Sequence, residues 1–488
     1  MNKKKFGFTV SHLTLVLICP CFTFTTLMFG QASEVSISLK TEGIKADSSV
    51  NTKYVSSVAS PYRPKSAYRI DPNEGKKETE SQQLSLSVEE AINYALIHNK
   101  SLMQNKNDIL KAVYSKREAI GAYITQASAA MDYNNYLGAS ATMDMGAPIT
   151  IDFTPSSTLN LQATQLVFNG NAMVGIMLGK IGQQMAELNE ENQALVLKKT
   201  IGIAYYTALV SAQMNEILRQ NYSDIKDMAA KTEIMAKAGA MEQTDADQLQ
   251  VQVNLVANLL KNNERNTELA YNMLKLGLGM DIRDTLLLTD KLESIISISN
   301  DVDLLGSSYD IGNDPDYKMI LKKEEMAKKQ KLMAIMNFLP SISGFYRYSY
   351  KAIVPKFDMS PAHVVGLSLS VPLFSGLQNT NKHRQSRIDL YNAEIQRSLV
   401  KDQLSTQEKQ LRFNLSTALE QYNTQKMNIE VATRVFKSIQ LKYEQGVKSS
   451  MELTNANSDY LQAQSDYINA ELKLLQARSE LEKILGTL

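Results

Sequence analysis

The histidines are the residues of this sequence best suited to acid–base catalysis or metal binding, and their spacing supports neither. The chain has four of them, His12, His98, His363 and His383. None lies in an HExxH or similar metal-ligand spacing. The sequence also lacks a GxSxG nucleophile elbow, a P-loop and the glycine fingerprint of a dinucleotide site. We therefore expect no catalytic residue, no cofactor and no metal ligand, and the chain is not expected to be an enzyme.

Three further features could suggest a ligand, and each has a simpler explanation. Asp245 and Asp247 form a DxD pair, but residues two apart on a helix do not face each other. The glycine pair in Gly277-Leu278-Gly279 is typical of a helix C-cap. The 22 methionines could suggest copper export, although packing in helical cores explains them more simply.

Length and charge restrict the class of protein. The chain has 488 residues, enough for two or three domains. Its 52 basic and 51 acidic residues nearly cancel, whereas a nucleic-acid binder would show a basic stripe. We therefore expect no nucleic-acid partner. Abundant charged, Gln and Asn residues with only 11 prolines are typical of long helices.

The N-terminus predicts export from the cytoplasm. Lysines at positions 3 to 5 precede a mostly apolar run and a small-residue cleavage site, so residues 1–32 are predicted to be a signal peptide. One alternative is a membrane anchor, since the apolar run is long. Lipidation of Cys19 or Cys21 is another, although the residues before Cys19 lack the small residue that a lipobox requires. Both cysteines lie in this segment, so the mature chain is expected to have no disulfide.

The rest of the chain has no apolar run of about 18 residues, so no membrane-spanning helix is expected and any crossing must use strands. Residues 33–83 are polar and are expected to form a disordered N-terminal arm.

From residue 84 the chain is an internal duplication. Gly239 and Gly279 near the end of the first copy recur 207 residues later as Gly446 and Gly486. The repeats are expected at 84–280 and 313–488, joined by a connector at 281–312. The first copy carries about nine extra residues between its strands, where length changes collect in loops.

Each repeat has the pattern helix, strand, strand, long helix, helix. The strands are expected at about 128–168 and 341–374. In the second copy apolar residues alternate with small or polar ones, which is the period of a strand with two unlike faces. We predict that the apolar set faces lipid; its members are Val365, Leu367, Leu369, Val371 and Leu373.

The long helices are expected at about 171–278 and 377–485. No glycine lies between Gly376 and Gly446 and no proline follows Pro372, which leaves a helix of roughly 100 Å at ~1.5 Å per residue. Its apolar residues recur at spacings of three and four, as in a coiled coil. A helix of this length needs lateral helices as partners.

Four strands cannot close into a barrel by themselves, and an open edge in hydrocarbon leaves backbone groups unpaired. Several chains are therefore expected to pool their strands into one barrel, with their coiled coils packed into a hollow cylinder. This reasoning does not fix the number of subunits.

At this point the chain resembles the TolC-like outer-membrane factor family over about residues 84–488. Five motifs carry the resemblance: Ser87-Val88-Glu89-Glu90-Ala91 with Asn99, Leu339-Pro340-Ser341-Ile342, Val371-Pro372-Leu373-Phe374-Ser375-Gly376, Tyr443-Glu444-Gln445-Gly446 and Leu485-Gly486-Thr487-Leu488.

The resemblance implies a homotrimer in the bacterial outer membrane, with a twelve-stranded β-barrel in lipid and a periplasmic α-helical tunnel. It implies a passive exit duct in a tripartite efflux pump or a type I secretion system. The implied partners are a periplasmic adaptor (membrane fusion) protein and, through it, an inner-membrane transporter of RND, ABC or MFS type.

The resemblance also implies a gate at the periplasmic end, where the matching residues are Asp245, Tyr443 and Lys448. The family usually has arginine where this chain has Lys448, and lysine lacks the bidentate fork. Acidic rings that constrict family tunnels match Glu452 and Asn455, of which only the first is charged. The alternative for all five is a solvated helix-turn-helix tip.

A different class of protein fits the long helices too. A secreted coiled-coil structural or adhesive surface protein would need no pore. The alternating strands, repeated at matching places in both copies, argue against it.

Overall fold

The computed structural model describes residues 83–487 apart from 145–147, 297 and 355–359. All of these belong to one unit, Thr79–Leu488. The expected signal peptide and nearly all of the expected N-terminal arm lie outside the described residues. Across the part of the chain that is described, no helix combines the length and apolar character needed to cross a bilayer.

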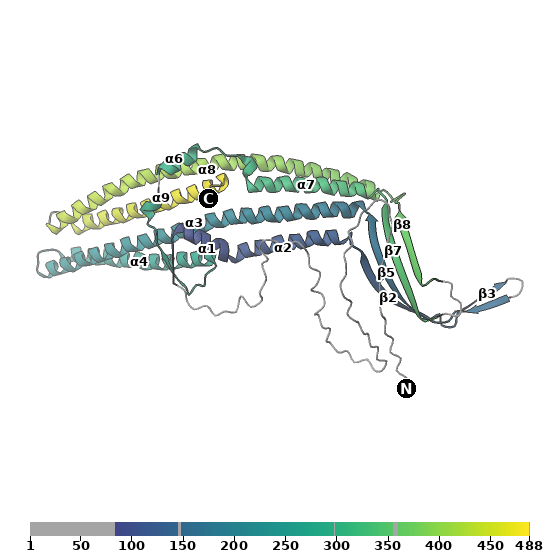
Figure 1. Ribbon diagram of the computed structural model, residues 1–488. Coiled ribbons are helices and arrows are strands. Elements are labelled where there is room, and N and C mark those ends of the chain that lie inside the picture. Colours follow the sequence, from purple (N-terminus) through teal and green to yellow (C-terminus); the bar gives the residue numbers. More distant parts are fainter. Residues whose placement is uncertain (1–82, 145–147, 297, 355–359, 488) are drawn as a thin grey trace, which may run out of the picture. The chain divides into compact units, whose positions relative to one another are not determined.

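Two pairs of long helices make up most of the described chain. Helix α3 (Gly170–Lys237, 68 residues) packs along α4 (Gln243–Leu278), and α8 (Gln378–Glu444, 67 residues) packs along α9 (Ser450–Leu485) (Figure 1). At ~1.5 Å per residue, α3 and α8 are each about 100 Å long. The mainly α fold expected from the sequence is confirmed.

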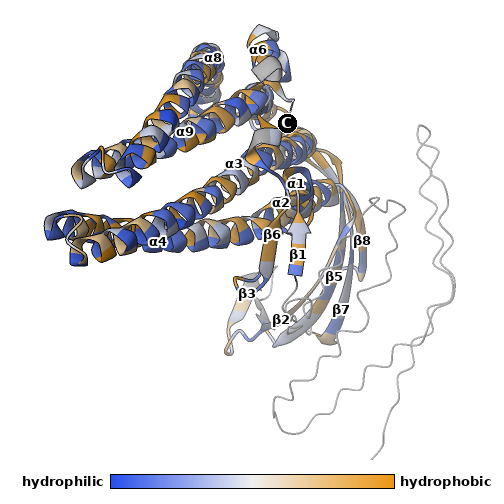
Figure 2. Cartoon of the chain, turned by 90° about the vertical axis from the view of Figure 1, so that its left-hand side faces the viewer, coloured by the Kyte–Doolittle hydropathy of each residue, from blue (hydrophilic) through white to orange (hydrophobic). Residues whose placement is uncertain are grey.

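The residues of α8 that follow the coiled-coil spacing are the residues that are buried. Its buried residues include Leu404, Leu411, Leu415, Ala418 and Tyr422, at spacings of three, four and seven. All of these except Leu404 belong to a cluster with Leu474, Ala477 and Leu481 of α9. Full burial of a leucine contributes about 1.5–3 kcal/mol. Figure 2 shows apolar residues interspersed with polar ones along all four long helices.

Shorter helices flank the long ones and begin at polar caps. Helices α1 (Val88–His98) and α2 (Lys100–Gly121) contact α3, and α7 (Pro315–Met336) contacts both α3 and α8. Asn99 Oδ1 accepts from the backbone N–H of Leu102 at 3.0 Å and caps α2. Asp314 caps α7 in the same way, so matching positions of the two repeats both serve as helix N-caps.

One four-stranded antiparallel sheet joins the two repeats. Its order is β2 (Gln126–Asn134), β5 (Ser156–Phe168), β7 (Ser341–Ile353) and β8 (His363–Ser370). The two copies meet where β5 pairs with β7. The expected four strands per chain are therefore present, and β2 and β8 form the two edges.

The extra residues of the first copy form a hairpin of their own. Strands β3 (Ser140–Asp144) and β4 (Pro148–Asp152) pair antiparallel between β2 and β5. We expected a longer loop at this place. The chain instead pairs the additional backbone groups with one another, which leaves fewer of them without a partner.

The connector between the repeats is structured and reaches back to the start of the described chain. Strand β6 (Thr285–Leu288) pairs parallel with β1 (Gln83–Leu86). Short helices follow: α5 (Leu292–Ile295), α6 (Ile298–Gly306) and the 3₁₀ turn η1 (Ile311–Asn313). The Arg412 guanidinium donates to the carbonyls of Leu305 and Ser307 at 2.5 and 2.6 Å, which holds the connector against α8.

Candidate functional site

The candidate gate lies where each helical pair turns. Gly239 follows α3 and Gly446 follows α8, and both have a φ of +73°. This left-handed conformation suits glycine because a side chain there would be strained. The turn at Gly446 places Tyr443 on the last turn of α8 and Lys448 just before α9.

Tyr443 links the two helical pairs. Its side chain is buried, and its hydroxyl lies 2.7 Å from the Thr232 hydroxyl on α3. The Thr232 hydroxyl also lies 3.0 Å from the Met228 carbonyl, and the Tyr443 hydroxyl lies 4.0 Å from the Met241 sulfur. Either hydroxyl can therefore be the donor between Tyr443 and Thr232. Burial raises the pKa of the Tyr443 phenol, which keeps the hydrogen in place at neutral pH.

Asp245 takes part in a second link between the pairs. Its carboxylate accepts from the Ser450 hydroxyl at the start of α9, and that hydroxyl also lies 2.7 Å from the Gln248 side-chain oxygen. Ser450 is almost fully buried. The contact therefore ties α9 to α4 within one chain.

Lys448 and Glu452 form one unit. The Lys448 ammonium pairs with the Glu452 carboxylate four residues later. Glu452 also accepts from the Ser449 backbone N–H at 3.1 Å, which completes the capping box of α9. The Lys448 hydrogen bond and then the Ser449 N–H hold the pKa of Glu452 below its usual value.

The structure thus joins two residues to which the resemblance gave separate roles. The resemblance implies that Lys448 belongs to the gate and that Glu452 forms an acidic ring. Within the chain, their charges offset each other. Asn455 lies on the next turn of α9 and is exposed.

A buried asparagine pair was not foreseen from the sequence. Asn221 on α3 donates to Asn457 on α9 at 2.7 Å, and both residues are buried. Next to them, Ile225, Leu249 and Leu453 are fully buried in a cluster that includes residues of all four long helices. Near the two helical turns, the four long helices of one chain therefore pack together as a four-helix bundle. The only indication of this pair in the sequence is a polar residue at a heptad position that is normally apolar.

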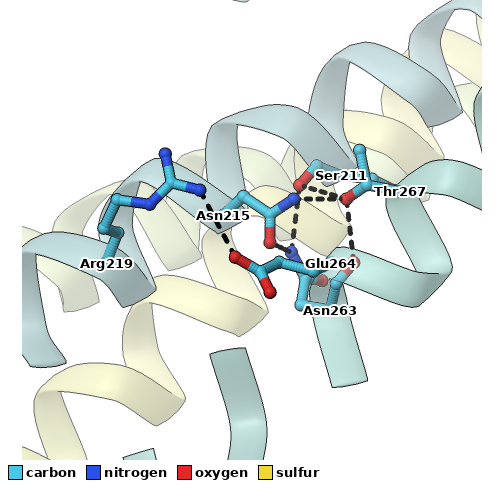
Figure 3. A network of polar contacts seen from close by, with 6 residues as sticks. All are labelled: Ser211, Asn215, Arg219, Asn263, Glu264 and Thr267. Atoms are coloured by element: carbon cyan, nitrogen blue, oxygen red, sulfur yellow. Dashed lines mark hydrogen bonds and ion pairs between the residues drawn. The ribbon is translucent and has the colours of Figure 1, made fainter. Parts of the chain in front are cut away.

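A second polar network fixes α3 on α4 (Figure 3). Asn263 donates to Asn215 at 2.9 Å, and Asn215 donates to the Thr267 hydroxyl at 2.7 Å. Arg219 and Glu264 add an exposed ion pair at 3.4 Å. Such a network sets the register of the two helices, because a slip would leave several amides without partners.

The sheet has one apolar face. Side chains of paired residues point to the same side, and the registers keep the apolar residues in phase across all four strands. Leu159, for example, lies between Met131 on β2 and Tyr350 on β7. Its apolar residues are Ala127, Ala129, Met131, Tyr133, Leu159, Leu161, Ala163, Ile342, Gly344, Tyr346, Tyr348, Tyr350, Val365, Leu367 and Leu369, and by register Ser157, Gln165 and His363 lie on the same face.

The opposite face is polar and hydrogen-bonded from strand to strand. Asn160 donates to Asp132 at 3.1 Å, and Ser349 donates to Asn160 at 2.7 Å. This separation into two faces is the one expected for a strand between lipid and water. Three of the five residues predicted to face lipid lie on the apolar face, with exposures of 77%, 79% and 64% for Val365, Leu367 and Leu369.

The other two members of that set lie beyond the strand. Strand β8 ends at Ser370, so Val371 and Leu373 follow it, and both are exposed. Pro372 between them has no N–H to donate to a neighbouring strand. The expectation that the strand continues to Leu373 is therefore wrong.

Comparison with known proteins gives a family for the second repeat and a fold for the whole described chain. Residues 311–487 match the sequence model of a family described as outer membrane efflux protein. A search of curated proteins found no match. The match confirms, for the second repeat, the family resemblance carried by the motifs.

Solved structures with a similar fold are outer membrane channels. The CmeC channel of Campylobacter jejuni is 15% identical with a TM-score of 0.68, over 88% of this chain and 94% of that one. VceC from Vibrio cholerae is 17% identical with a TM-score of 0.65, over 82% and 96%. The open state of MtrE from Neisseria gonorrhoeae is 14% identical with a TM-score of 0.65, over 82% and 88%. At such identities the likeness establishes the fold.

Proposed function

We propose that this chain, whose residues 311–487 belong to the outer membrane efflux protein family, forms the outer-membrane exit duct of an efflux pump or a type I secretion system. It conducts solutes passively from the periplasm to the exterior. The observation that carries the proposal is the four-stranded sheet with one exposed apolar face and two open edges. The absence of catalysis remains a prediction from the sequence.

The open edges call for more than one copy. In hydrocarbon, each unpaired backbone group at the edges of β2 and β8 would cost several kcal/mol. If edge β8 of one copy pairs with edge β2 of the next, no edge remains. Three copies of the four-stranded sheet then give a twelve-stranded barrel. The number three rests on the family resemblance.

The same assembly explains the helices. Exposed apolar residues on α8, including Ile388, Tyr391 and Ile395, need a covering surface. Neighbouring copies supply it when their helices pack side by side into a periplasmic tunnel.

The duct needs partners that supply energy. The sequence has no P-loop and therefore no apparent means to use ATP itself. A periplasmic adaptor protein docks on the tunnel and connects it to an inner-membrane transporter of RND, ABC or MFS type.

Conductance is the direct test of the function. Purified protein in a planar bilayer should form discrete ion-conducting channels, and native mass spectrometry in detergent should give three copies. The alternative, a secreted coiled-coil surface protein, predicts neither channels nor a defined trimer. A well-folded protein that conducts nothing at any salt concentration would overturn the proposal.

The tip is the proposed gate. Asp245 and Tyr443 hold the two helical pairs of one chain together, and Lys448 lies at the turn that meets the neighbouring copies. Glu452 and Asn455 line the constriction just inside. Exposed ion pairs contribute only about 0–1 kcal/mol each, so closure depends on their repetition around the axis.

The double variant Tyr443→Phe with Lys448→Glu tests the gate. It removes the hydroxyl that contacts Thr232 and places a second carboxylate beside Glu452, so single-channel conductance should rise while the amount of assembled protein stays the same. Lys442→Glu, an exposed change of equal charge on α8, controls for the charge alone. High salt should open the native duct partly, by screening. If neither the double variant nor high salt changes the conductance, the constriction lies elsewhere.

A further inference from the structure

The polar face of the sheet carries a cation that no acid in its row offsets among the described strand residues. The registers align Ser128 on β2, Gln162 on β5, Arg347 on β7 and Val364 on β8 in one row. Within the described strands, this row contains no carboxylate. Arg347 is exposed and, like all arginines, carries its charge at every physiological pH.

Neutral groups hold the Arg347 side chain in place. Its Nε and Nη2 atoms both donate to Gln162 Oε1, at 3.1 and 3.0 Å. Its guanidinium carbon lies 5.9 Å from the centre of the Phe345 ring. Gln162 and Phe345 belong to the same polar side of the sheet by register. The side chain is therefore oriented on that side, and neither contact neutralises its charge.

The other two charges on this face offset each other. Asp132 and Lys351 both align with Thr158 and thus share a row. Asp132 accepts from Asn160 at 3.1 Å, and Lys351 donates to the Ser360 carbonyl at 3.0 Å. Arg347 consequently sets the net charge of the described polar face, one positive charge per chain.

We propose that Arg347 determines the charge selectivity of the duct, so that anions and anionic solutes pass more readily than cations. The proposal rests on the proposed function, because the polar face becomes the lumen only when several sheets close into a barrel. Three copies then place three guanidinium groups at one level of the lumen. At the tip, the Lys448 and Glu452 charges offset each other, so this pair adds no opposing net charge.

The size of such a barrel makes the effect measurable. Twelve strands about 4.8 Å apart and tilted by about 40° enclose a radius of about 12 Å. The arginine side chain extends inward from this wall. The Debye length is about 10 Å at 0.1 M salt and about 3 Å at 1 M. The ring of charges therefore acts across the lumen in dilute salt and is screened in concentrated salt.

The test is the chloride-to-potassium permeability ratio, obtained from reversal potentials across a planar bilayer with a KCl gradient near 0.1 M. The wild-type ratio should exceed one and approach one near 1 M. Arg347→Gln should lower it about threefold or more, from the Coulomb energy of three screened charges. Arg347→Lys, which keeps the charge but not the forked contact with Gln162, should leave it near the wild-type value. Asp132→Asn should raise it.

The outcomes separate this inference from the proposed function. A conducting wild-type channel whose ratio is one or less near 0.1 M overturns the inference and leaves the duct intact. The same holds if Arg347→Gln conducts with an unchanged ratio, or if Arg347→Lys and Arg347→Gln lower it equally. If the wild-type protein forms no channel, the proposed function itself fails. Should Arg347→Gln not assemble, the wild-type salt dependence and Asp132→Asn decide the question.

Discussion

Two adjacent residues of β8 provide a matched test of which face of the sheet meets lipid. Leu367 is 79% exposed on the apolar face, and Ser368 pairs with Ser343 on the polar face. An arginine on the lipid face at the bilayer midplane costs about 2–4 kcal/mol. In the proposed trimer, three copies would raise this to roughly 6–12 kcal/mol, comparable to the whole stability of many domains. Leu367→Arg should therefore prevent stable assembly.

Ser368→Arg should assemble normally, because its side chain would enter the water-filled lumen of the proposed barrel, where a charge remains solvated. The measurement is the amount of oligomer that resists dissociation on gels without heating, from isolated outer membranes and from protein refolded into lipid vesicles. Leu367→Ala controls for loss of the leucine side chain. Equal loss of oligomer in both arginine variants would refute the assignment of the faces, and with it the transmembrane role of β8.

Three further changes test the packing and the tip. Asn457→Ala leaves the buried Asn221 amide without its partner and should lower the free energy of unfolding by about 1–3 kcal/mol in urea titrations. Replacing both asparagines by leucine should cost less than the single change, and a cost equal to or above that of the single change would contradict this reasoning. Gly279→Ala should lower the melting temperature, because Gly279 has a φ of +83° and a Cβ there would lie 2.4 Å from the His98 carbonyl oxygen. The control is Gly306→Ala, where an added Cβ would have no heavy atom of another residue within 4 Å, and it should have little effect. Glu452 has a lowered pKa in the folded chain, so its contribution to stability is present above the unfolded value of about 4.3 and is lost as the pH falls through the folded value. The protection of the amides at the start of α9 against hydrogen exchange, relative to the intrinsic rate at each pH, should therefore fall in that acidic range, and Glu452→Gln should remove this pH dependence.

Local periodicity accounts for what the sequence could predict. The spacing of Leu411, Leu415, Ala418 and Tyr422 predicts a helix with one buried stripe, and these four residues are buried. The alternation around Leu367 predicts a strand with unlike faces. Both patterns depend on residues close in sequence, and each occurs in both copies, which reduces the chance of coincidence.

Contacts between residues far apart in the chain could not be predicted from the sequence. Strands β1 and β6 are only four residues long and pair across about two hundred residues of sequence. A strand this short carries too little alternation to be recognised. Asn221 and Asn457 lie 236 positions apart. Nothing in either local sequence shows that the two amides meet, because the register between helical pairs is a tertiary property.

One feature of the tip could have been predicted and was not. Ser449-Ser450-Met451-Glu452 is a capping-box sequence. Lys448 and Glu452 also have the spacing of a helical ion pair. Both patterns indicate that Glu452 serves the N-terminus of its own helix. The family resemblance assigns Glu452 to the tunnel constriction and does not include this local role.

The two repeats are equivalent in fold but have different surfaces, and this affects any ring built from them. Helix α4 exposes an apolar stripe at coiled-coil spacing, formed by Val251, Leu255, Leu259, Leu269, Met273 and Leu276. The positions 207 residues later on α9 are all polar: Ser458, Gln462, Asp466, Gln476, Glu480 and Lys483. The two helical pairs have equivalent folds but favour different neighbours. Burial of the apolar stripe on α4 is favourable, whereas burial of the charged groups on α9 costs hydration free energy. In a ring of copies, the two kinds of surface would consequently alternate. The rotational symmetry of the ring would then be set by the number of chains and not by the number of helical pairs, which is twice as large.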